Sequence, residues 1–367
     1  GAERIEAACR HFTKCGGCSV QQLSNANYQS WKHDIVCQAL DRQNIDTSVL
    51  KNLIPGDPHT RRRIRVFARR LARGTILGFR ERGSHRVVVL EECPIMVSEI
   101  LAILPQLREF LIQSLKVGDS AEIAITYANT GLDITLSLPT EPDLADRERL
   151  AVFADANDIS RINWNLFNSK FGEVAEPIVT RRVVKMQFND VAVAIPPDAF
   201  VQPTAQGERI IREKVTEAVE KAKRIVELFS GCGALALPLA RRGHHVSAFD
   251  LAVDHIEALS LAARLNGMGE RVKVEARNLH RRPLLGTEFD NVDAVILDPP
   301  RGGAVQQANH LAASGVPMIV YVSCDPHSFA RDAKILISGG YSLMNVMPFD
   351  QFLWSQHVEL IGIFEKD

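Results

Sequence analysis

Cys324 and Asp298 are the residues whose type and position could carry out covalent chemistry. Each follows a short apolar run, in VSCDPHSFARD and LDPPRGG, and Asp250 ends another such run. Because open parallel sheets bind ligands beyond the carboxyl ends of their strands, we expect these residues to converge on one cleft. A thiolate there could act as a nucleophile, whereas a lone cysteine is more often a small buried hydrophobe.

A glycine-containing loop lies upstream, in VELFSGCGALALPLA, between an apolar run and a helical stretch. Glycines let the backbone approach a ligand, and an acid about 20 residues later can bind a ribose, as Asp250 could. The third glycine of the dinucleotide motif is replaced by Ala236, and the chain has no lysine-bearing phosphate loop. The pattern favours a ligand with a ribose and no phosphates, such as S-adenosylmethionine; a tight turn of any α/β protein is the alternative.

Four of the seven cysteines have spacings that suggest ligands: Cys9, Cys15, Cys18 and Cys93. The chain shows no export signal, so a disulfide framework is not expected. Four thiolates suit a four-iron cluster or zinc. The five residues between Cys9 and Cys15 differ from the paired two-residue spacings typical of zinc, and Cys93 is followed by proline, as in ferredoxin-type runs.

Residues 61–86 contain ten arginines and one acid, Glu81, although the formal net charge of the whole chain is −1. Phe67 and Phe79 lie among these arginines. A charge run is usually a solvated strand face, but arginines interleaved with aromatic side chains are also typical of contact with an RNA backbone.

The composition, 367 residues with 46% hydrophobic and 24% charged side chains, is that of a globular protein with two domains. No apolar run is long enough for a membrane span and no secretory pattern is visible, so we expect a cytoplasmic protein without membrane contact. No pattern indicates an obligate protein partner.

The apolar periodicity predicts how these residues are positioned. From residue 224 short apolar runs alternate with helical stretches, which predicts a parallel α/β sheet, and the tail predicts an antiparallel hairpin at its edge. Residues 24–43 predict an amphipathic helix, residues 120–138 a β-hairpin, and residues 139–150 a polar connector. We therefore expect a strand-rich front domain over residues 1–192 and an α/β domain over residues 193–367.

Six segments together resemble the RNA uracil-5-methyltransferase family, whose members make 5-methyluridine in transfer and ribosomal RNA. They are CRHFTKCGGCSVQQ, GSHRVVVLEECPI, PPDAFVQPTAQGE, LDPPRGG, VSCDPHSFARD and DQFLWSQHVE. The resemblance implies a Rossmann-like class I methyltransferase domain behind a strand-rich α+β front domain that carries a [4Fe-4S] cluster. It implies S-adenosylmethionine as cofactor and RNA as partner, with ribosomal RNA favoured over transfer RNA.

The family pattern also implies roles for individual residues. Cys324 matches the nucleophile, which adds to carbon 6 of uracil so that carbon 5 can attack a methyl group, and Glu359 matches the base that removes the proton from carbon 5. The cysteine ligands of the cluster would be Cys9, Cys15, Cys18 and Cys93. The cofactor-binding set would be Gln202, Phe229, Ala234, Asp250, Asn278 and Asp298.

Four positions depart from the family pattern. Thr204 and Asn278 stand where asparagine and an acid are usual, and Glu227 and Leu353 where aspartate and proline are usual. Because of Thr204 and Asn278, a non-catalytic iron–sulfur RNA-binding protein with a relic methyltransferase fold stays open as an alternative. For the four cysteines, a zinc site in place of the cluster also stays open.

Overall fold

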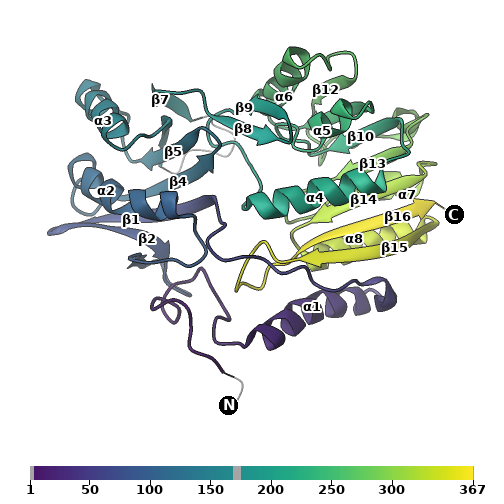
Figure 1. Cartoon of the computed structure of the whole chain (residues 1–367), viewed down its shortest axis with the longest axis horizontal. Helices are drawn as coiled ribbons and strands as arrows, with labels where there is room; N and C mark the ends of the chain where they lie inside the picture. The colour runs from purple at the N-terminus through teal and green to yellow at the C-terminus, as the bar shows by residue number, and fades with distance from the viewer. Residues whose placement is uncertain (1–3, 168–174, 367) are drawn as a thin grey trace.

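Two large β-sheets lie side by side in the computed structural model, which describes residues 4–167 and 175–366 (Figure 1). Each of these sheets has seven strands within the described ranges, and a separate two-stranded hairpin accompanies them. No helix in those ranges is long and apolar enough to cross a membrane.

The C-terminal sheet has the order β12-β11-β10-β13-β14-β16-β15. Its first five strands are parallel, and β16 pairs antiparallel with both β14 and β15. The predicted parallel sheet with an antiparallel hairpin at its edge is confirmed. The strands are β10 (Arg224–Leu228), β11 (His245–Asp250), β12 (Val272–Ala276), β13 (Ala294–Leu297), β14 (Met318–Ser323), β15 (Tyr341–Phe349) and β16 (Glu359–Lys366).

Helices cover both faces of this sheet, which is why its central strands are continuous apolar runs. All four residues of β13 are fully buried. Helix α8 begins where Asp325 accepts hydrogen bonds from two backbone N–H groups and Pro326 takes the first helical position. The helices are α4 (Ala205–Ala218), α5 (Ala236–Arg241), α6 (Val253–Leu265), α7 (Val305–Ala312) and α8 (Pro326–Ser338).

The N-terminal sheet has the order β3-β2-β1-β4-β5-β6-β7 and is antiparallel except between β5 and β6. Its strand β1 alternates buried and more exposed residues, as expected where one face is packed. The predicted hairpin over 120–138 is confirmed as β4 and β5. The strands are β1 (Arg63–Leu71), β2 (Gly74–Arg80), β3 (Val87–Val89), β4 (Ser120–Ala128), β5 (Gly131–Leu138), β6 (Arg161–Leu166) and β7 (Glu176–Thr180).

Helices α2 (Ser98–Ser114) and α3 (Leu144–Ala156) bury their apolar residues against one face of this sheet. The expectation of a polar connector over residues 139–150 was wrong, because α3 begins inside it. Asp143 and Asp146 form a reciprocal capping box at its start. Only Leu150 and Ala154 of this helix are buried, so its sequence looks polar although it is helical.

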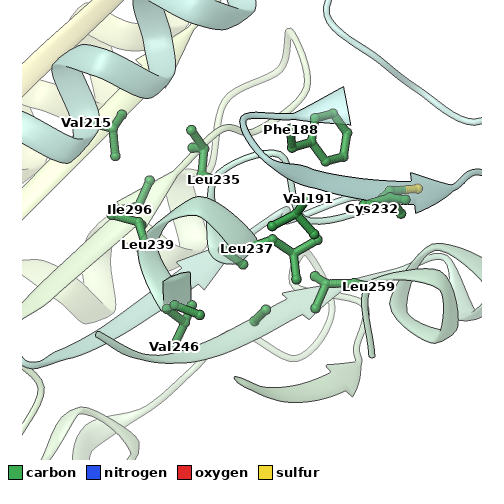
Figure 2. Packing of buried hydrophobic residues seen from close by; sticks show 14 of the residues in the cluster. Phe188, Val191, Val215, Cys232, Leu235, Leu237, Leu239, Val246, Leu259 and Ile296 are labelled. Carbon is green, nitrogen blue, oxygen red and sulfur yellow. The ribbon is translucent and has the colours of Figure 1, made fainter. Parts of the chain in front are cut away.

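The hairpin of β8 (Lys185–Phe188) and β9 (Val191–Ala194) spans the predicted division between the domains. Its side chains belong to the core of the C-terminal sheet: Figure 2 shows Phe188 and Val191 among Cys232, Leu235 and Leu237. Cys232 is buried in this cluster, as expected for a small filler residue. The division at residue 193 stays a prediction.

Helix α1 (Asn25–Asp41), the predicted amphipathic helix, packs against α8 of the C-terminal sheet. In Figure 1 it lies beside β15 and α8. The chain that follows it runs along β15, where Leu50 and Ile54 form bridges with Val346 and Phe349. The edge strand is thus covered by an N-terminal segment of the chain, which protects its unpaired backbone groups.

A buried polar network joins α1 to residues 350–357. Lys32 is fully buried and forms an ion pair with Asp350 at 2.8 Å. The Lys32 ammonium also donates to the backbone carbonyls of Phe352 and His357, and the Tyr28 hydroxyl donates to Asp350. Residues 350–357 contain no helix or strand, so these contacts are what hold the segment in place.

Candidate active site

A pocket opens at the carboxyl ends of β10 and β13. Four of the six predicted cofactor-binding residues line it: Gln202, Phe229, Ala234 and Asp298. Glu227, Ser230 and Phe200 line it as well. The carboxyl ends of β10 and β13 thus meet at this pocket, whereas Cys324 and Asp250, which we expected in the same cleft, are not among its lining residues.

Asp298 and Glu359 are connected by two side-chain amides. Gln202 Nε2 donates to Asp298 Oδ2 at 3.0 Å. Gln351 Nε2 donates to Gln202 Oε1 at 3.0 Å and to Glu359 Oε2 at 2.6 Å. The two carboxyl groups, which are 61 positions apart in the sequence, thus belong to one hydrogen-bonded chain.

Both carboxyl groups have raised pKa values. The pKa of Glu359 is raised to about 8, mainly by burial and also by the charge of Asp298, against the lowering effects of the Gln351 amide and Arg301. Burial also raises the pKa of Asp298 to about 7, against the donation from Gln202. Each group can therefore hold or release a proton near neutral pH, which suits a general base or acid.

Cys324 follows the last residue of β14 and is partly exposed. The pKa of its thiol is raised to about 12, mainly by burial and also by the charges of Glu359 and Asp298, while Arg301 lowers it. Because these charges act on the thiol, it lies in the same electrostatic environment as the two carboxyl groups. The expected convergence of Cys324, Asp298 and Asp250 on one cleft stays a prediction, but the structure brings the charges of Asp298 and Glu359 within reach of the Cys324 thiol.

The glycine-containing loop leads from β10 into α5. Gly231 has φ +51° and donates its N–H to Asp250 Oδ2 at 2.9 Å, while Asp250 Oδ1 accepts from the N–H of Ala252 at 2.9 Å. Asp250 thus fixes the loop. Asn278 accepts hydrogen bonds from the N–H groups of His280 and Arg281 in its own turn. Asp250 and Asn278 are not part of the pocket lining.

Two polar atoms of the pocket have no partner among the residues that the structure describes: Glu227 Oε2 and Ser230 Oγ, both buried. Burial raises the pKa of Glu227 well above its ordinary value, and the charges of Asp298 and Asp250 add to the effect. Buried polar atoms are normally satisfied. This pocket therefore suits a ligand with polar groups.

Comparison with known proteins shows to which family the chain belongs. The family model described as tRNA (Uracil-5-)-methyltransferase matches residues 81–367. The chain belongs to the RNA uracil-5-methyltransferase family. An uncharacterized RNA methyltransferase of Mesorhizobium japonicum is 39% identical over 364 residues, which are 99% of this chain and 85% of that protein. The chain is thus an S-adenosylmethionine-dependent RNA (uracil-5-)-methyltransferase.

Two further proteins of known activity are similar to this chain over nearly its whole length. The 23S rRNA (uracil(1939)-C(5))-methyltransferase RlmD of Aeromonas hydrophila is 28% identical, over all of this chain and 83% of that protein. The tRNA (uracil-54, C5)-methyltransferase of Pyrococcus abyssi, solved with S-adenosyl-L-homocysteine, superposes with a TM-score of 0.75 at 24% identity, covering 99% of this chain and 86% of that one. The class I methyltransferase fold with a β-rich N-terminal region is confirmed.

Sequence reasoning missed Gln351 and Lys32, which matter for this methyltransferase site. Gln351 was part of the quoted segment DQFLWSQHVE, but no role was assigned to it. The available signal was a polar residue two positions after the end of an apolar run, eight positions before Glu359. Lys32 gave no signal, because a lysine on an amphipathic helix normally faces solvent.

The four predicted ligand cysteines are all buried. The pKa of Cys18 is raised to about 12, mainly by burial and further by the charges of Cys93, Cys15 and Cys9, so the four sulfurs lie near one another. The N–H of Gly17 donates to Cys15 Sγ at 3.4 Å. Within residues 4–167 and 175–366, no group of three or more His, Cys, Asp or Glu residues is arranged to hold a metal ion.

The arginines of residues 61–86 divide into two groups. Arg62 is buried and pairs with Glu208 of α4 at 2.6 Å, and Arg65 bonds with Glu122 and Asp198. The Arg62 pair joins the segment before β1 to α4, whereas Arg65 pairs with Glu122 on the neighbouring strand β4 of its own sheet and with Asp198. Other arginines of the run are exposed: Arg69, Arg73, Arg80, Arg82 and Arg86.

We predict that Glu227→Gln stabilises the free protein more at pH 8 than at pH 5. The raised pKa means that the folded protein keeps a proton that the unfolded chain loses above the ordinary value of 4.5. Stability therefore falls as pH rises from that value, and a neutral amide removes the loss. We expect the free energy of unfolding in urea to rise by about 1–3 kcal/mol at pH 8.

The matched control is Glu257→Gln on the exposed face of α6, which should change stability little at either pH. An equal gain from Glu227→Gln at both pH values would contradict the assignment of a shifted carboxyl group.

Proposed function

We propose that this enzyme methylates carbon 5 of a uridine in ribosomal RNA through a covalent adduct with Cys324, and that Glu359 is the base. The observation that carries the proposal is the shared environment of Cys324, Glu359 and Asp298: both carboxyl groups raise the pKa of the Cys324 thiol, and Asp298 raises the pKa of Glu359. A nucleophile beside a proton-accepting carboxylate is what the reaction requires.

The steps follow from the chemistry of uracil. The Cys324 thiolate adds to carbon 6, which places electrons of the ring on carbon 5 as an enolate. Bound S-adenosylmethionine would supply the methyl group: as carbon 5 bonds to the methyl carbon, the bond from that carbon to the sulfonium sulfur would break, and the sulfur would leave as a neutral thioether. Glu359 removes the proton from carbon 5, the double bond reforms, and the bond from carbon 6 to sulfur breaks. Arg301 lowers the pKa of Cys324 and so favours the thiolate.

The residues of the pocket suit S-adenosylmethionine. We propose that Phe229 and Ala234 contact it, and that Gln202 and Asp298 lie where it meets the target base. Asp250 at the end of β11 would hold the ribose hydroxyls, and Asn278 would contact the adenosine part of the cofactor. The unpartnered atoms of Glu227 and Ser230 support a polar ligand here.

Ribosomal RNA is proposed as the substrate because the relative from Aeromonas hydrophila is named for 23S rRNA and aligns over the whole chain. The exposed arginines of residues 61–86 would contact phosphates. A loop of RNA already presents unstacked bases, which lowers the cost of flipping the uridine into the pocket.

We propose a [4Fe-4S] cluster on Cys9, Cys15, Cys18 and Cys93. Support comes from the burial of all four thiols and from their mutual electrostatic influence. Backbone N–H groups of Ile95 and Met96 donate to Cys93, as is common around cluster sulfurs. A zinc ion on the same four sulfurs, each about 2.3 Å from the metal, is the alternative, and metal analysis distinguishes the two.

Cys324→Ala should abolish methylation, whereas Glu359→Gln should accumulate an RNA adduct that survives denaturation, because the thiolate cannot leave until carbon 5 loses its proton. The measurement uses labelled S-adenosylmethionine and RNA from a strain that lacks this gene. Full turnover by either variant would reject the role assigned to that residue. Wild-type protein that binds RNA and never transfers methyl would favour the relic-fold alternative.

Binding to a single-stranded transcript should weaken with salt. If about four exposed arginines contact phosphates, the slope of log affinity against log salt is about −2.8, since each contact contributes about −0.7. Arg69→Ala should reduce the slope by one contact, and Arg108→Ala on α2, behind the N-terminal sheet, is the control. Affinity that does not vary with salt would remove this assignment.

Protein purified without oxygen should contain about four irons and four acid-labile sulfides per chain. Cys93→Ser should lose the visible absorption and most of the iron, while Cys37→Ser, a cysteine on α1 outside the proposed ligand set, should retain both. Stoichiometric zinc with no iron would establish the alternative.

A further inference from the structure

Gln351 occupies a central position in the chain of hydrogen bonds between the two carboxyl groups. Its side chain is 5% exposed, and its amide nitrogen uses both N–H groups, one on Gln202 Oε1 and one on Glu359 Oε2. Both neighbours are acceptors, so the amide nitrogen must face them and the amide oxygen must point away.

The amide oxygen points into a space beside α4 that depends on a glycine. Gln351 Oε1 has no hydrogen-bond partner in the described part of the chain. A Cβ atom at residue 207 would lie 2.2 Å from this oxygen and 3.0 Å from Thr204 Oγ1. Gly207 lies in the first turn of α4 without a positive φ. Its missing side chain, not its backbone freedom, makes room for Gln351.

The segment that carries Gln351 is fixed by contacts outside the reacting set. The adjacent Asp350 pairs with buried Lys32, and Trp354 donates its N–H to Tyr28. The backbone of Gln351 is therefore fixed by these contacts, and its side-chain amide is buried where it donates to Glu359. This is the arrangement needed to keep one orientation of a carboxylate.

We propose that Gln351 is a positioning residue for the base: its amide fixes the Glu359 carboxylate in the orientation that accepts the proton from carbon 5, and Gly207 provides the space that this requires. The inference rests on the proposed role of Glu359. It assigns a function to a side chain that need not touch the uracil ring or the methyl donor.

The charges around Glu359 define what a pH profile should show. Asp298 raises its pKa, Arg301 and the Gln351 donation lower it, and Cys324 lies within reach of its charge. Loss of the donated hydrogen bond removes a contact that favours the carboxylate. The pH at which the base becomes active therefore moves upward.

The test compares Gln351→Leu, Gly207→Ala and wild type, with labelled S-adenosylmethionine and RNA from a strain that lacks the gene. Methylation is followed between pH 6 and 10 together with the fraction of protein attached to RNA after denaturation; this range brackets the value of about 8 for Glu359. We expect Gln351→Leu to slow turnover about tenfold at neutral pH, as loss of a hydrogen bond to a charged group implies. The attached fraction should rise, and the midpoint of the pH profile should move up.

Gly207→Ala should produce smaller changes in the same direction by displacing the Gln351 amide. Its unfolding temperature should fall, because the crowding of a buried side chain costs more than the helix propensity of alanine gains. The matched control is Gly315→Ala, where an added Cβ meets nothing within 4 Å. It lies just before β14, at the end of the sheet opposite Cys324, and should change nothing.

Two results would separate failure of this inference from failure of the proposed function. If Glu359→Gln traps an adduct while Gln351→Leu and Gly207→Ala keep the wild-type midpoint and attached fraction, Gln351 has no positioning role. If Glu359→Gln turns over normally, the assignment of the base is wrong and the inference falls with it.

Discussion

Two carboxyl groups held out of water at one edge of a sheet are the constraint on which this site depends. Burial disfavours their charged forms, and their charges repel each other, so their pKa values rise to about 7 and about 8. The amides of Gln202 and Gln351 donate to them and limit that rise. A pair that exchanges protons near neutrality is useful for a reaction in which carbon 5 must lose one.

This arrangement requires contributions from distant parts of the chain. Gln202 precedes α4, Asp298 and Cys324 follow parallel strands, and Glu359 begins the antiparallel strand β16. The segment before β16 has no regular structure, and the buried pair of Lys32 and Asp350 holds it. Removing one partner of such a pair leaves an uncompensated charge, so α1 helps to maintain the site although it provides no reacting group.

The cysteine segment and the active site share this same support. The backbone N–H groups of Ser19 and Val20, which directly follow Cys18, donate to the carbonyl of Trp354. Trp354 lies three residues after Gln351. The segment that bears the proposed cluster ligands therefore contacts the segment that orients the proposed base. Ion pairs such as that of Arg62 with Glu208 join the two halves of the chain as well, so part of the arginine-rich run serves packing and only the remainder is free for RNA.

The sequence by itself determined the parallel sheet, its terminal hairpin and the residues at its carboxyl edge, because apolar periodicity and strand-end motifs are local signals. It also indicated Cys324, Asp298 and Glu359 through the family pattern. It missed α3, whose polar sequence hid a helix that buries only two side chains in its length. Only the tertiary structure decided that Lys32 is buried, that Gln351 links two carboxyl groups and that Gly207 leaves space for its oxygen. These properties depend on contacts between segments more than a hundred residues apart, and no spacing along the chain encodes which polar groups meet when water is excluded.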